Sequence, residues 1–147
     1  MGSSGALRGS VFVVSLAFVC LGAGAALAEE WDVKRALELA VELEDTLAQA
    51  LEAAEAAPQQ ETAMQERTRD AAVVQMRYTH RTSRELVTKL RIGGERDATE
   101  PFLIQVESAY RNAIETARNA VPQAAVAPLL EKAESLILSL QKLYALE

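Results

Sequence analysis

Four stretches of the chain repeat apolar residues at alternating steps of three and four, and this spacing restricts the fold more than any other feature. The spacing places apolar side chains along one face of an α-helix. It predicts four helices, over 31–57, 61–92, 99–121 and 128–146, the last with an earlier turn possible from Gln123. Residues that stop helices separate them, namely Pro58, Gly93, Gly94 and Pro122. Pro101 suits the first turn of the third helix, where a missing N–H costs nothing.

Alanine is abundant on the predicted buried faces of the first and third helices, which would let these helices approach closely. The first helix repeats Ala36, Ala40, Leu43, Leu47, Ala50 and Ala54, and the third repeats Leu103, Val106, Tyr110, Ala113, Ala117 and Ala120. Short connections favour antiparallel neighbours. The fold class predicted is therefore all-α, an antiparallel up-down-up-down four-helix bundle formed by residues 29–147 as a single domain.

Residues 1–28 have the composition of a secretory signal peptide. Arg8 is their only charged side chain, an apolar run from Val11 to Leu21 follows, and Ala26-Leu27-Ala28 suits a cleavage site. We therefore expect a mature chain that begins at Glu29 and is exported, to a bacterial periplasm or outside the cell. The alternative is an uncleaved membrane anchor over 11–28, although its apolar core is short for a span, which takes about 20 residues.

Removal of that segment would leave a mature chain without cysteine, because Cys20 is the only cysteine. Disulfides, thiolate metal sites and a nucleophilic thiol are then excluded. The mature chain would carry 14 basic and 21 acidic residues, a net charge of −7. Nucleic-acid binding depends largely on phosphate neutralisation by basic residues. We therefore expect no nucleic-acid partner.

The second predicted helix has a polar middle on its buried face. Met76, His80 and Ser83 follow one another on that face, with Thr79 beside them. One interpretation is a structural histidine that is hydrogen-bonded to Thr79, Ser83 or Glu44, because buried polar groups are normally paired. The alternatives are a copper or zinc site at Met76 and His80, since thioether and imidazole suit cuprous copper, and a pH-sensitive contact.

In helix number, helix length and export, the predicted architecture resembles the periplasmic four-helix cytochromes of the c-prime and b types, over most of residues 31–146. The resemblance implies haem, but the residues depart from both patterns. The mature chain has no Cys-x-x-Cys-His, and Met76 and His80 lie one turn apart on one helix, so they cannot bind opposite faces of a haem. We therefore expect no haem and no other resident cofactor.

The residue patterns of common enzymes are not found in the sequence. A single histidine cannot supply the two Glu-x-x-His pairs of a di-iron bundle. Gly93-Gly94 has neither a Walker nor a dinucleotide-binding context. Ser83 lies beside His80, but no nucleophile elbow accompanies them. We expect a protein that is not an enzyme.

Arg77, Arg81 and Arg84 form an arginine stripe along the second helix. Three guanidinium groups on one face can hold a phosphate or a carboxylate. The same stripe could instead pair with the first helix, because residues 29–57 have a net charge of −7 and residues 61–92 have a net charge of +3. Flanking charges of opposite sign favour pairing between neighbouring helices.

The sequence thus favours an exported, non-enzymatic binding module of the cell envelope. Its partner would be a protein or an anionic envelope component, with Arg77, Arg81 and Arg84 as contacts, and a homodimer is also compatible. One alternative is a periplasmic metal- or cofactor-binding bundle centred on Met76 and His80. Another is a structural subunit of an envelope complex.

Overall fold

The computed structural model describes residues 31–58, 62–118, 120 and 123–145, and the predicted signal segment lies outside them. The described residues form four α-helices and no strand. The helices are α1 (Val33–Glu55), α2 (Ala63–Arg91), α3 (Arg96–Ala117) and α4 (Gln123–Leu143). The all-helical prediction is confirmed, as is the number of helices. No described helix combines the length and the apolar character that crossing a membrane requires.

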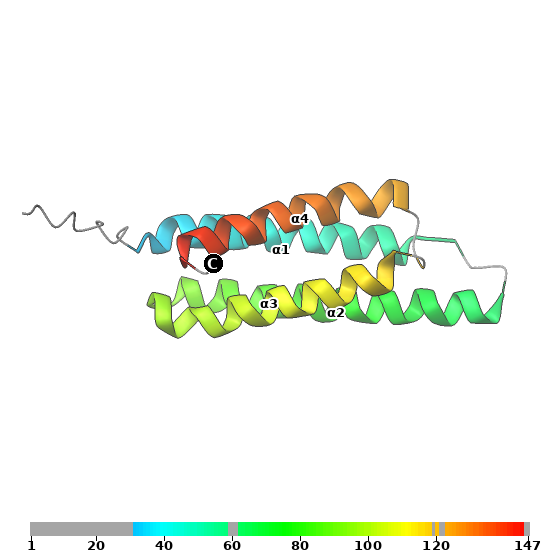
Figure 1. The fold of residues 1–147 in the computed structure, drawn as a ribbon, viewed down its shortest axis with the longest axis horizontal. Helices are drawn as coiled ribbons and strands as arrows, with labels where there is room; N and C mark the ends of the chain where they lie inside the picture. The colour runs from blue at the N-terminus through cyan, green and yellow to red at the C-terminus, as the bar shows by residue number, and fades with distance from the viewer. Residues whose placement is uncertain (1–30, 59–61, 119, 121–122, 146–147) are drawn as a thin grey trace, which may run out of the picture.

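Successive helices run in opposite directions along one long axis (Figure 1). α1 packs between α2 and α4, and α2 packs between α1 and α3, whereas α3 and α4 approach each other much less closely. The first turns of α2, drawn in green, extend past the ends of the other helices (Figure 1). α2 is also the longest helix, with 29 residues.

Local hydrogen bonds explain where the helices begin and end. Asp32 caps α1 by accepting a hydrogen bond from the Arg35 N–H. Thr62 and Gln65 form a capping box at the start of α2. α2 ends in a Schellman motif, because Gly93, at a φ of +81°, donates to the Leu90 carbonyl and Gly94 donates to the Lys89 carbonyl.

α3 begins at Arg96, three residues before the predicted start at Thr99. Pro101 consequently lies inside the helix and not in its first turn. The extra turn is held from the residue that follows α4, because the buried Tyr144 hydroxyl donates to Thr99 Oγ1 at 2.7 Å. Arg96 also donates to the Tyr144 carbonyl. These contacts come from the far end of the chain, which the local sequence pattern does not reveal.

The core divides into two apolar clusters along the bundle. The leucine-rich cluster holds eight buried leucines, Leu39, Leu43, Leu47, Leu86, Leu90, Leu103, Leu136 and Leu140, together with Tyr110 and Tyr144. The alanine-rich cluster lies at the other end and contains Ala50, Ala54, Ala72, Val73, Met76, Ala113, Ala117, Ala120 and Val126. All twelve residues of the two repeats predicted for the first and third helices are buried.

Four buried hydroxyl groups lie near the boundary between the two clusters. Three lie between the clusters in the chain order of α2, and the fourth lies on α1 one residue before Leu47 of the leucine-rich cluster. They belong to Thr46, Thr79, Thr82 and Ser83. Each hydroxyl donates to a backbone carbonyl of its own helix, at 2.7–2.9 Å. These bonds satisfy the donors locally, so the polar middle needs no partner from another helix.

Candidate functional site

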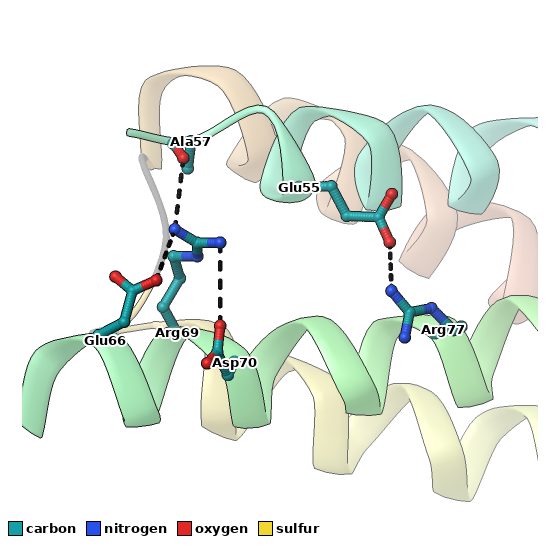
Figure 2. A network of polar contacts seen from close by, with 6 residues as sticks. All are labelled: Glu55, Ala57, Glu66, Arg69, Asp70 and Arg77. Carbon is teal, nitrogen blue, oxygen red and sulfur yellow. Dashed lines mark hydrogen bonds and ion pairs between the residues drawn. The ribbon is translucent and has the colours of Figure 1, made fainter. Parts of the chain in front are cut away.

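Two arginines of the stripe pair with carboxylates of α1. Arg77 Nη2 lies 2.5 Å from Glu55 Oε1, and Arg84 Nε lies 3.4 Å from Glu44 Oε1. Figure 2 shows the Arg77 guanidinium facing the Glu55 carboxylate across the gap between the two helices. Both arginine side chains remain more than half exposed. These pairs are the interhelical contacts that the opposite charges of the two segments favour.

Arg81 differs from its two neighbours because it makes no ion pair with α1 among the described residues. Its guanidinium lies 5.1 Å from the centre of the Tyr78 ring, within the range of a cation–π contact. Its Nε is 4.0 Å from Glu85 Oε1 on the same helix. The stripe therefore does not converge on a single anion, since each guanidinium has a different neighbour.

A shallow hollow of about 290 Å³ lies at the N-terminal end of the stripe. Val74, Arg77, Tyr78 and Arg81 line it. Val74 is 56% exposed. Tyr78 is fixed from α3, because Gln105 Nε2 donates to its hydroxyl at 3.1 Å. Exposed apolar surface with a positioned aromatic ring and a cation is typical of a protein contact.

The hollow belongs to a longer line of exposed residues on α2. We call this line the outer seam; its residues are Met64, Arg67, Ala71, Val74, Tyr78, Arg81, Glu85 and Thr88, all exposed. The steps alternate between three and four, so the side chains lie on one face, opposite the buried face of α2. The spacing of this line is present in the sequence, but of its residues only Arg81 was predicted as a contact.

Arg69 is a further residue that the sequence analysis missed. It lies at the start of the buried face of α2, one turn before Val73, and its side chain is only 15% exposed. Arg69 Nη1 contacts Glu66 at 3.0 Å and the Ala57 carbonyl at 3.5 Å, and Nη2 is 3.8 Å from Asp70 (Figure 2). It therefore links α2 to Ala57, which lies just after the end of α1.

The polar middle of α2 does not assemble around His80. His80 is half-buried, and within the described residues its imidazole makes no hydrogen bond or ion pair. Thr79 and Ser83 donate to the carbonyls of Gln75 and His80, and Glu44 faces Arg84. The three suggested hydrogen-bond partners are thus engaged elsewhere.

Met76 is buried within the alanine-rich cluster, whereas His80 reaches the surface. Among the described residues, no group of three or more His, Cys, Asp or Glu side chains could hold a metal ion. A copper or zinc site at Met76 and His80 would need further ligands, because two seldom suffice.

The looser packing between α3 and α4 leaves two smaller hollows, of about 200 and 100 Å³. Tyr110 and Glu134 border both. The Tyr110 hydroxyl donates to the Leu130 carbonyl of α4 at 2.6 Å. Burial raises the pKa of the Tyr110 phenol well above its usual value, and the nearby carboxylates of Glu134 and Glu131 raise it further. Tyr110 therefore acts as a neutral hydrogen-bond donor that ties α3 to α4.

Comparison with known proteins adds no family to this description. No protein-family model, no curated protein and no solved structure matches the chain.

Proposed function

We propose that this chain is an exported, non-enzymatic four-helix bundle that binds a partner protein through the outer seam of α2. The observation that carries the proposal is the cluster of Val74, Tyr78 and Arg81, an exposed apolar group beside an aromatic ring and a cation. Export is inferred from the signal-peptide composition of residues 1–28.

The cluster has properties that favour binding over a purely solvated surface. Tyrosine and arginine are enriched among residues that dominate protein interfaces. Tyr78 is already positioned by Gln105 and by Arg81, so little side-chain freedom would be lost on binding. Arg77 and Arg84 flank the cluster, and their pairs with α1 fix them in place.

Site-specific photo-crosslinking in the cells that make the protein tests this function. A photoreactive residue placed at Val74 should give covalent adducts with a partner protein, because this side chain would lie inside the interface. The matched control places the same residue at Ser135, an exposed position on α4. Adducts that form equally at both positions, or at neither, would refute binding through the outer seam.

The same cells test the predicted export. Mass spectrometry of the purified protein should show a chain that begins at Glu29. An exported protein that still begins at residue 1 would contradict cleavage and would indicate that the segment is retained as a membrane anchor.

A further inference from the structure

The outer seam is a solvent-exposed helix face with the spacing of a coiled-coil contact. Steps of three and four over Met64–Thr88 are those of heptad positions a and d. The described part of the chain exposes six large apolar side chains. Three of them lie on the outer seam, namely Met64, Val74 and Tyr78. The first turns of α2 also project past the ends of the other described helices, so none of these helices lies beside this part of the seam (Figure 1).

Charges of both signs lie on or beside the seam. Arg67 and Arg81 occupy it, and so does Glu85, while Asp70 and Arg84 lie on its flank. A purely acidic partner would satisfy the arginines but would repel Asp70 and Glu85. A partner helix that carries the same positive and negative side chains in the reverse order would place opposite charges next to each other. An antiparallel copy of α2 has that order.

We infer that the partner on the outer seam is a second copy of this chain, packed antiparallel through α2; this inference rests on the proposed function. The two-fold axis passes near the level of Met76. Val74 of each copy then meets Tyr78 of the other, so the apolar groups fill the centre of the contact. Central aromatic and apolar groups surrounded by polar ones are typical of stable interfaces.

The same register pairs opposite charges on both sides of the axis. Arg67 faces Glu85 of the second copy, and Asp70 faces its Arg84. Arg81 faces the second copy's Ala71, whose small side chain leaves room for the guanidinium. Arg77 lies near the axis opposite its own counterpart, where each is neutralised by Glu55 at 2.5 Å.

A parallel arrangement lacks this complementarity. In register, it would place Arg67 against Arg67 and Arg81 against Arg81, and like charges directly opposite each other are destabilising. An antiparallel dimer also covers nearly the full length of α2, including the turns that project beyond the bundle. Charge pattern and covered length therefore favour the same arrangement.

Disulfide trapping tests the orientation and the register. Met64→Cys and Thr88→Cys are introduced separately into full-length chains carrying Cys20→Ser, which removes the only native cysteine. In the inferred register residue 64 faces residue 88 of the second copy. Mixing the two variants under mild oxidation should therefore give a crosslinked heterodimer, whereas each variant alone should stay uncrosslinked.

Other outcomes of the trapping overturn the inference. Self-crosslinking of Met64→Cys would indicate a parallel pair. A shift of one heptad moves the facing residues by about 10 Å along the axis. That distance exceeds the reach of a disulfide, for which the Cα atoms must lie within about 7 Å. Absence of the heterodimer would therefore exclude this register.

Charge reversal measured by sedimentation gives an independent test. Arg67→Glu should weaken dimerisation at least about tenfold, because it places like charges opposite each other at two symmetric positions. The double variant Arg67→Glu, Glu85→Arg should restore it, since the pair is reformed in reverse. Both positions are exposed, so the melting temperature under monomeric conditions serves as the folding control. A wild-type chain that stays monomeric at tens of micromolar, or a double variant without rescue, contradicts the inference.

The failure of this inference can be told apart from failure of the proposed function. Adducts at Val74 with a different protein, together with a monomeric chain, would exclude self-association and retain binding through the outer seam. Adducts of twice the mass of the chain support both self-association and binding through the outer seam. Absence of adducts, together with a monomeric chain, removes both.

Discussion

The two ends of the bundle are built differently although their helices share one apolar spacing. The leucine-rich cluster fills its end with large side chains and adds the buried hydroxyl contacts of Tyr110 and Tyr144. The alanine-rich cluster has few large side chains, and two polar contacts join its helices: the largely buried Arg69 and the exposed Arg77–Glu55 pair. Periodicity thus determines which face is buried, and side-chain volume determines how that face is stabilised.

The two ends of the bundle should contribute differently to folding stability. Burial of large side chains provides most of the hydrophobic stabilisation, at roughly 25 cal/mol per Å² of apolar surface. We therefore expect the leucine-rich cluster to dominate folding stability. The alanine-rich end contributes less; the outer seam begins at this end and runs along nearly the whole of α2.

The largest effect should come from a cavity in the leucine-rich cluster. Leu140 is fully buried there, and Leu140→Ala should lower the free energy of unfolding by about 2–5 kcal/mol. The matched change at the other end, Val126→Ala, removes two carbon atoms instead of three from an equally buried site and should cost less. Urea denaturation measures both. Equal losses would contradict the division of stability between the ends.

A smaller loss should come from overfilling the alanine-rich cluster. Ala113→Leu inserts three carbon atoms at a site that is 1% exposed, and it should cost about 1–3 kcal/mol. Ala98→Leu makes the same change at an exposed position of α3 and should be nearly neutral. Thermal denaturation followed by circular dichroism compares the two. A stabilised Ala113→Leu variant would show that this end is underfilled.

Alkaline pH should weaken the leucine-rich end through its two buried tyrosines. Burial is the main reason that the pKa values of Tyr110 and Tyr144 lie above the ordinary value of 10.0. Above about pH 10 the phenols of the unfolded chain ionise while the folded ones stay neutral, so stability falls as pH rises. Below that pH this contribution is fully present.

Replacement of the phenols tests that pH dependence. Tyr110→Phe should cost about 1 kcal/mol at neutral pH, because it removes the hydrogen bond to Leu130. It should also reduce the fall in stability above pH 10, and Tyr110→Phe combined with Tyr144→Phe should reduce it further. Urea titrations between pH 8 and about 12 measure this. If the free energy of unfolding of these variants fell as steeply above pH 10 as that of the wild type, the two phenols would not be the cause of the alkaline loss of stability.

The smallest effect should come from the exposed ion pairs between α1 and α2. Arg77→Gln and Arg84→Gln should each cost about 0–1 kcal/mol in low salt, and salt should mask the loss. A double-mutant cycle with Glu55→Gln isolates the Arg77–Glu55 term. A loss that persists in high salt would show that Arg77 contributes through packing and not through charge.

Local periodicity was sufficient to predict four helices and their buried faces. Leu43, Leu103 and Ala113, for example, are all buried as their spacing predicts. This information is local, because a helix repeats every 3.6 residues and an apolar stripe must be covered. The positions of Gly93 and Gly94 likewise predicted the end of the second helix.

The tertiary structure alone decided how the polar groups were used. It placed Arg77 and Arg84 against α1, turned Arg81 onto Tyr78, and engaged Thr79 and Ser83 with their own helix instead of His80. It also left the outer seam of α2 uncovered. Such choices depend on the relative register of helices that are distant in the chain, and the period of a single helix carries no information about that register.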